Sequence, residues 1–242
     1  MTDAHCHCRT GADRHFVCEP FGGEPGEGDM AFFGVHPWAF LDGTAAEDGW
    51  LGRLRARLVA NPAAGVGEIG LDRLKVRTIP DAMREAFRAQ LALAAELRRP
   101  VVLHGAKCWG QVVETVRRLR SEVFGIIGQS EQSNNRTILS FLFHGFSRSD
   151  GLIPDIVALG GYVSVGPAVL NDHAVNYRAL VKKIPLDRLL VETDRTEESA
   201  PTCPPVGAVA AKVAELRGMS PEDLEKTVDE NADRFICYNM HT

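Results

Sequence analysis

The sequence predicts an α/β protein built as a (β/α)8 TIM-type barrel. Short apolar runs alternate with longer amphipathic segments along the chain, and repeated strand–helix units of this kind imply parallel strands. Seven or eight units within 242 residues suit a closed barrel. An open, doubly wound sheet is the alternative. Because no linker or repeat is visible, we expect residues 1–242 to form a single domain.

The strand candidates are short apolar runs of the length expected for buried strands. They are Thr2 to His7, Met30 to Val35, Ala64 to Ile69, Pro100 to His104, Leu139 to His144, Tyr162 to Val165 and Arg188 to Glu192.

The helix candidates carry apolar residues at a spacing of about 3.6. They are Ala45 to Ala60, Asp81 to Arg98, Trp109 to Glu122, Leu152 to Leu159, Ala174 to Lys183, Val206 to Arg217 and Pro221 to Phe235. Ser220 is the expected cap of the last helix. Gly22 to Gly28 and Gly128 to Arg136 are expected to be exposed loops.

The composition is that of an ordinary globular protein able to bury a large core, with 45% hydrophobic and 24% charged residues. No run of about 18 apolar residues occurs, so we expect a cytoplasmic protein with no membrane contact and no obligate protein partner. The six isolated cysteines favour reduced thiols. A net charge of -5 argues against a broad basic surface that wraps long nucleic acid. It still allows a nucleic-acid enzyme whose bound cations supply positive charge.

The first strand candidate contains the segment TDAHCHC. Side chains alternate between the two faces of a strand, so Asp3, His5 and His7 share one face. Cys6 and Cys8 lie on the other face, so histidines and cysteines cannot easily share one metal ion. Two imidazoles at a strand end make a good ligand pair, with Asp3 behind them as a supporting or packing group. The alternative is two surface histidines near a chain end.

Later strand candidates also end in possible ligands. Glu68 follows an apolar run between glycines, His104 ends VVLH, His144 ends LFH, and Glu192 and Asp194 end LLVETD. Each alone has an ordinary structural explanation, as a hydrogen-bonded histidine or a helix cap. In a parallel barrel, however, the C-terminal ends of the strands converge on the face where active sites lie. We therefore expect these side chains to meet.

Four histidines and two or three carboxylates exceed the needs of one tetrahedral metal ion. Two divalent ions sharing a bridging carboxylate would use them all, and Glu68 is the expected bridge. Mixed imidazole and carboxylate ligands accept zinc, manganese, nickel, iron or magnesium, so the identity of the metal stays open.

Six ordered motifs resemble those of the TatD-related metal-dependent deoxyribonucleases, which belong to the wider amidohydrolase barrel group. They are DAHCH, GVHPW, GEIGLD, VVLHGAK, LFHGFS and LLVETD, and the closing NADRF is also similar. The resemblance runs from Thr2 to about Phe235. It implies a distorted (β/α)8 barrel and metal-dependent hydrolysis of phosphodiester bonds, often from a DNA 3′ end.

The resemblance also implies the roles of individual residues. One metal ion would be held by His5, His7, Glu68 and Asp194, and the other by Glu68, His104 and His144. His36 and Glu192 would lie beside them and face the phosphate or the attacking water. We accordingly expect Asp194, Glu192 and His36 to be catalytic, with Asp194 accepting the proton of the water.

The chain departs from the family pattern at the expected substrate rim. The family commonly has His-Ser-Arg after its fourth strand, where this chain has HGAK ending in Lys107, and Arg195 follows ETD in place of the usual alanine. Lys107, Arg195 and Arg148 are candidate phosphate contacts, the alternative being ordinary solvated charges. Trp38 and Trp109 are candidates for stacking a base, or else pack against the core.

Three functions fit these residues. The first is a two-metal phosphodiesterase acting on DNA or another phosphoester through a metal-activated water. The second is an amide, ester or lactone hydrolase with the same ligands. Barrels of that group often bridge their metals with a carbamylated lysine, whereas the bridge here is Glu68, which favours the deoxyribonuclease-like branch by resemblance. The third is a non-catalytic metal-binding barrel, which a complete set of ligands disfavours.

Overall fold

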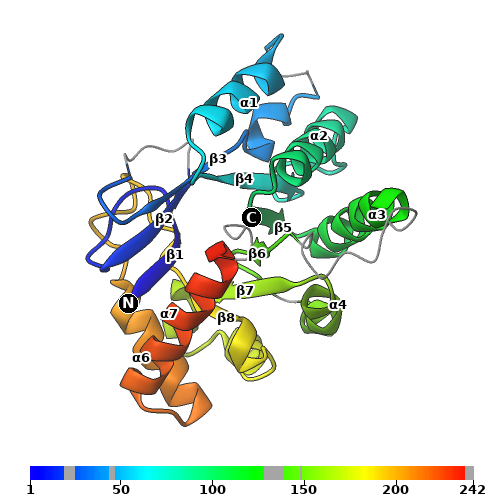
Figure 1. Cartoon of the computed structure of the whole chain (residues 1–242). Coiled ribbons are helices and arrows are strands. Elements are labelled where there is room, and N and C mark those ends of the chain that lie inside the picture. Colours follow the sequence, from blue (N-terminus) through cyan, green and yellow to red (C-terminus); the bar gives the residue numbers. More distant parts are fainter. Residues whose placement is uncertain (19–24, 44–46, 128–138, 148, 238–242) are drawn as a thin grey trace.

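Eight parallel strands lie side by side in the order of the sequence, which confirms the predicted α/β barrel. The computed structural model describes the chain except for residues 19–24, 44–46, 128–138, 148 and 238–242. The strands are β1 (Thr2–Cys6), β2 (Arg14–Cys18), β3 (Met30–Phe33), β4 (Gly65–Asp72), β5 (Val101–Ala106), β6 (Phe141–Phe143), β7 (Gly161–Val165) and β8 (Leu189–Val191). In Figure 1 the strands surround the centre of the molecule and the helices lie outside them.

The barrel closes through the C-terminal end of β1 and the residues that follow β8. The backbone N–H of Asp194 donates to the carbonyl oxygen of His5 at 2.9 Å, and the N–H of His7 donates to the carbonyl oxygen of Arg195 at 2.8 Å. Within the described ranges, β1 and β8 form no regular ladder with each other. The closure therefore joins the C-terminal ends of the first and last strands, where predicted ligands lie.

The helices follow the predicted pattern. They are α1 (Trp50–Ala60), α2 (Asp81–Leu97), α3 (Trp109–Ile127), α4 (Ile153–Ala158), α5 (Val175–Val181), α6 (Val206–Arg217) and α7 (Pro221–Cys237), with short 3-10 turns at Pro37–Phe40, Asp150–Leu152, Pro167–Leu170 and Leu186–Arg188. Helix α1 begins later than predicted, because Gly49 precedes it with a φ of 76°. Ser220 caps α7 as expected, since its Oγ accepts from the N–H of Asp223 at 3.1 Å.

The strand list from the sequence was incomplete, because it omitted β2. The segment RHFVC offers only a short apolar run after two polar residues, and no helix stands between β1 and β2. The alternation of strand and helix that predicted the fold is thus missing at this point. Of the two predicted loops, the described part of the first, residues 25–28, is irregular with a turn at residues 27–28, and Gly128 to Arg136 lies outside the described residues.

Helix α7 covers the end of the barrel where the strands begin (Figure 1). Phe235 is fully buried and packs against Phe16, Phe32 and Tyr162, with ring centroids 5.7 to 6.1 Å apart. The amide of Asn231 donates to the carbonyl oxygens of Leu186, in the 3-10 turn before β8, and of Leu189, the first residue of β8. None of the helices in the described part of the chain has the length and apolar character needed to span a bilayer.

Candidate metal centre

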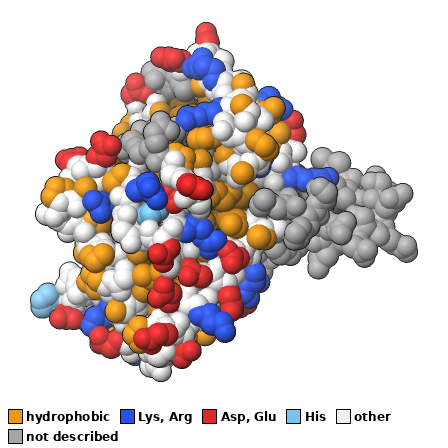
Figure 2. All heavy atoms as spheres, turned by 60° about the vertical axis from the view of Figure 1, so that its left-hand side comes forward, with side chains coloured by type: hydrophobic (Ala, Val, Ile, Leu, Met, Phe, Trp, Pro, Cys, Tyr) orange, Lys and Arg blue, Asp and Glu red, His pale blue; other side chains and the backbone are white. Residues whose placement is uncertain are grey.

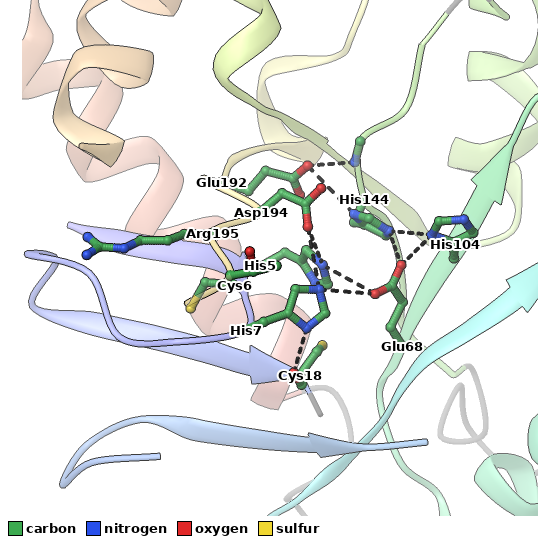
Figure 3. A network of polar contacts seen from close by, with 12 residues as sticks. His5, Cys6, His7, Cys18, Glu68, His104, His144, Glu192, Asp194 and Arg195 are labelled. Atoms are coloured by element: carbon green, nitrogen blue, oxygen red, sulfur yellow. Dashed lines mark hydrogen bonds and ion pairs between the residues drawn. The ribbon is translucent and has the colours of Figure 1, made fainter. Parts of the chain in front are cut away.

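The predicted ligands from the ends of five strands meet on one side of the barrel (Figure 3). His5 and His7 come from the end of β1, Glu68 from β4, His104 from β5, His144 from the residue after β6, and Asp194 from the segment after β8.

The two histidines of the first strand face the site, and the cysteines do not. Nδ1 of His7 donates to the carbonyl oxygen of Cys18 at 2.8 Å, which turns Nε2 toward the carboxylates of Glu68 and Asp194 as the possible ligand atom. The thiol of Cys6 points instead toward the carbonyl oxygen of Phe16, at 3.8 Å. Burial raises the pKa of Cys6, so its thiol stays protonated.

Asp3 ties the first strand to the segment after the last one. Its two carboxylate oxygens accept from the backbone N–H and the hydroxyl of Thr193, at 2.9 and 2.7 Å. Burial raises the pKa of Asp3 to about 6, against the lowering effect of these hydrogen bonds. Asp3 thus supports the ligand pair from behind, as expected from strand alternation.

Glu68 lies at the centre of the cluster with one oxygen toward each half. Its Oε1 contacts Nδ1 of His104 and lies 2.5 Å from Nε2 of His144, while its Oε2 lies 3.4 and 3.7 Å from Nε2 of His7 and His5. Burial acts to raise the pKa of Glu68, but the imidazoles of His144 and His104 lower it well below its usual range. The carboxylate is therefore held ionised.

A glycine lets the strands that carry Glu68 and His104 lie close together. Gly70 has a φ of 152°, and a Cβ there would lie 2.0 Å from the carbonyl oxygen of His104. No other residue type fits at this position without moving β5.

His104 is oriented by Asp72, which the sequence analysis did not include among the site residues. Nε2 of His104 donates to Oδ2 of Asp72 at 3.1 Å, and the same oxygen accepts from Nε1 of Trp38 at 2.7 Å. Burial acts to raise the pKa of Asp72, but the hydrogen bonds from His104 and Trp38 lower it to about 2. Asp72 is therefore an anion that fixes the tautomer of His104.

Glu192 lies behind His144, at the wall of the site. Its Oε1 accepts from the N–H of Gly145 at 2.7 Å and lies 3.8 Å from Nδ1 of His144, and its other oxygen accepts from the hydroxyl of Ser164. With its exposed fraction at 1%, this carboxylate is placed to orient His144.

Asp194 stands at the opening of the site. Its Oδ1 lies 3.3 and 3.5 Å from Nε2 of His5 and His7, and its side chain is 51% exposed. The residue has a φ of 52°, a left-handed conformation that aspartate tolerates better than most residues. Partial burial acts to raise the pKa of Asp194, but the contacts with His5 and His7 lower it well below its usual range.

His36 contributes a further imidazole from the loop after β3. Its Nδ1 accepts from the N–H of Trp38 at 3.1 Å, so its proton is on Nε2, which lies 3.6 Å from Oε1 of Glu68. Burial lowers the pKa of His36, with the contact to Glu68 acting in the opposite direction. His36 is therefore a neutral N–H donor facing the cluster.

Three overlapping groups of side chains have the close spacing of a metal site: His5–His7–Asp194, His5–Glu68–His144 and His36–Glu68–His104. In the third group His36 presents its Nε2–H, so it is placed to donate a hydrogen bond rather than to bind the ion. Both ring nitrogens of His5 are buried without a hydrogen-bond partner in the described structure. An imidazole buried in this way is costly unless something else satisfies it. A cation bound between these side chains would do so, and therefore the donor set fits a metal ion.

The candidate substrate residues are placed differently from one another. Lys107 is exposed at the end of β5, whereas the side chain of Arg195 extends away from the cluster in Figure 3. Arg148 lies outside the described residues. Trp109 is buried against Phe143 and Phe146, which supports packing rather than stacking with a base.

An open cavity of about 1200 Å³ adjoins the cluster on the side of β7 and β8. Glu192, Thr193 and Asp194 line it at the metal-ligand end, and Tyr177 and Lys183 line it farther out. The site is thus accessible from solvent past Asp194.

Comparison with known proteins identifies the family. The model of the TatD-related DNase family matches residues 26–237. The chain belongs to this family. It is 29% identical over 218 residues to the uncharacterized metal-dependent hydrolase YabD of Bacillus subtilis, a match that covers 86% of this chain and 78% of that protein. The same identity over 227 residues relates it to the 3'-5' ssDNA/RNA exonuclease TatD of Cronobacter sakazakii, covering 88% of this chain and 79% of that one.

Solved structures show the same barrel. The TatD homologue YJJV of Escherichia coli superposes with a TM-score of 0.77 at 22% identity and covers 97% of this chain and 96% of its own. The phosphotriesterase homology protein of Escherichia coli superposes with a TM-score of 0.55 at 13% identity, covering 97% and 98%. The buried histidine and carboxylate clusters therefore belong to a TatD-family metal-dependent hydrolase with an amidohydrolase-like fold.

Proposed function

We propose that this protein is a two-metal phosphodiesterase that removes nucleotides from the 3′ end of single-stranded DNA. The observation that carries the proposal is the position of Glu68, whose two oxygens face two different groups of histidines. Such a carboxylate suits the bridge between two cations. The name of the Cronobacter relative, a 3'-5' ssDNA/RNA exonuclease, supports the substrate class.

One ion would be held by His5, His7, Asp194 and one oxygen of Glu68, and the other by His104, His144 and the second oxygen. When bound, zinc, manganese or magnesium would supply Lewis acidity and lower the pKa of a water molecule. Each of the ligands except Asp194 is largely buried, which keeps bulk water out of the site.

Three further groups have proposed roles in the reaction. Asp194 reaches the opening of the site, so it is placed to accept the proton of the attacking water. The Nε2–H of His36 is placed to donate to a phosphate oxygen. Glu192 lies 3.8 Å from Nδ1 of His144, which has no hydrogen-bond partner among the described residues, and would act through that ring.

The shape of the site supports a strand end as substrate. Glu68 is 2% exposed, and the site opens to solvent beside Asp194 and the cavity. A flexible single strand can bring a terminal phosphodiester to this depth, whereas the backbone of an intact duplex is held at the width of the double helix. An ester, amide or lactone hydrolase with the same ligands is the alternative, and the activity screen below separates the two.

The test is a screen of metal-reconstituted protein against single-stranded DNA, RNA, duplex DNA and simple carboxylic esters. Single-stranded DNA is expected to be degraded from its 3′ end, and His104→Ala is expected to lower kcat by about 100-fold or more together with metal content. His15→Gln is the matched control. His15 is an equally buried histidine that contacts Asp29 rather than the cluster, so this variant keeps its metal. Hydrolysis of esters without hydrolysis of any oligonucleotide would refute the proposal.

A further inference from the structure

We propose that four cations beside β4 and β5 bind the phosphates of the strand that leads away from the metal centre. These residues, the cationic rim, are Arg73, Lys75, Arg77 and Lys107. The inference rests on the proposed function, because it assumes that the substrate is a polyanionic strand. It adds the direction in which that strand leaves the site.

The rim is joined to the metal centre by a chain of short contacts. Nζ of Lys75 lies 3.2 Å from the centre of the Trp38 ring, close enough for a strong cation–π interaction. The indole of Trp38 donates to Asp72, which in turn accepts from His104. Lys75 is therefore two side chains away from a proposed metal ligand.

The backbone places a second pair of cations beside the first. The N–H of Arg73 donates to the carbonyl oxygen of Ala106 at 2.9 Å, and Lys107 follows Ala106 in the chain. Arg73 and Lys107 thus flank a single hydrogen bond between the ends of β4 and β5. Arg77 lies two residues beyond Lys75 in the loop that leads to α2.

These four cations are available to a ligand. All are exposed, and none forms an ion pair with any residue that the structure describes. Elsewhere many basic side chains are neutralised, as in the pairs Arg178–Asp172 and Lys183–Asp150. The face in Figure 2 shows acidic side chains gathered in its lower half. In a protein of net charge -5, a run of unpaired cations is a local site for an anion.

The opposite side of the metal centre is less suited to a phosphate backbone. The cavity there is lined by Glu192 and Asp194 near the centre, and its Lys183 is paired with Asp150. This cavity is large but has no net positive charge, so it suits the uncharged base and sugar of the terminal nucleoside better than a phosphate. The strand would therefore lie across the site, with its last nucleoside in the cavity and its preceding phosphates on the rim.

The test compares the metal-loaded wild type with the double variant Arg73→Gln/Arg77→Gln, which leaves Lys75 and its contact with Trp38 in place. The substrates are a single-stranded DNA of about 12 nucleotides, within the range of strand-binding sites, and bis(p-nitrophenyl) phosphate, which is too short to span the rim. We expect KM for the DNA to rise about 10-fold with kcat little changed. We also expect the slope of log KM against log salt concentration to become shallower by about 1.4, for two lost phosphate contacts. Parameters for the small phosphodiester should stay within about twofold.

The matched control is Arg88→Gln/Lys226→Gln, which removes the same charge from exposed residues on α2 and α7. An unchanged KM and salt slope for the DNA in the rim variant would overturn the inference. If the wild type hydrolyses neither substrate, the proposed function fails instead. Fluorescence anisotropy with the labelled DNA then still tests the rim, because the rim variant must bind more weakly than both the wild type and the control.

Discussion

Replacement of Asp72 by asparagine is expected to weaken metal binding without unfolding the protein. The carboxylate accepts three hydrogen bonds: from Nε2 of His104 and Nε1 of Trp38 on one oxygen, and from the N–H of Leu74 at 2.5 Å on the other. An asparagine has a single carbonyl oxygen. Whichever way its amide turns, the NH2 group must face either the donors of His104 and Trp38 or the N–H of Leu74. The negative charge that polarises the imidazole is lost in either orientation.

The size of the effect follows from what Asp72 does for His104. Loss of a carboxylate that orients a ligating histidine typically weakens metal binding by about 10- to 100-fold, or about 1.4 to 2.7 kcal/mol. His5, His7 and Asp194 do not contact Asp72. The loss of affinity should therefore affect the metal ion held by His104 and His144, and not the ion held by His5, His7 and Asp194.

The assay is a calorimetric titration of the metal-free variant with Zn²⁺ or Mn²⁺, beside the wild type and the control Asp187→Asn, which replaces a surface carboxylate that is 59% exposed. For Asp72→Asn we expect that one of the two metal ions binds more weakly and that the other binds with wild-type affinity. A high metal concentration should restore its activity. Wild-type affinity at both steps in Asp72→Asn would refute the role given to this carboxylate.

Three further outcomes are expected. Phe235→Ala should lower the free energy of unfolding by about 3 to 5 kcal/mol in urea denaturation, because it empties the buried space beneath the strands. Glu192→Gln should lower metal affinity and kcat together, because Glu192 acts through His144. The pH profile of kcat should stay unchanged. A profile that loses one ionisation would show instead that Glu192 exchanges protons with the substrate. Removal of metal by a chelator should lower Tm, since metal at about 100 times its Kd adds about 2.7 kcal/mol, and an unchanged Tm would argue against a metal held by the buried imidazole of His5.

The sequence was sufficient to predict the barrel and the meeting of the ligands, because both follow from regular periodicity. Parallel strands that end in His5, Glu68, His104 and His144 bring those residues to one face in any barrel. The same periodicity could have identified Asp72. It stands four residues after Glu68 in β4, and even spacing in a strand predicts two side chains on one face, although the register of β4 against β5 shifts between Val66 and Ile69.

Other features depend on backbone conformations that periodicity does not encode. Glu192 and Asp194 are two residues apart, which predicts a shared face in a strand. The strand ends at Val191, however, and Asp194 takes a φ of 52°. This turn sends Asp194 to the opening while Glu192 stays behind His144. The rim depends likewise on the course of the loop after β4, which is set by the hydrogen bond between Arg73 and Ala106.

The two halves of the cluster differ in how firmly the protein holds them. His104 is fixed by Asp72 and His36 by the N–H of Trp38, so the imidazoles next to the cationic rim are oriented before any ion binds. On the other side, His7 is held by the carbonyl oxygen of Cys18, but His5 has no hydrogen-bond partner among the described residues, and Asp194 is half exposed at a left-handed backbone position.

Because preorganised ligands lose less freedom on binding, the half beside the rim should hold its ion more tightly. The other half, which opens into the cavity, contains the residue placed to accept a proton. The tightly held metal ion beside the rim would then position the substrate phosphate. The more mobile ligands beside the cavity would take part in proton transfer. The stepwise metal titration of Asp72→Asn measures this difference directly, since it disturbs only the half that is already ordered.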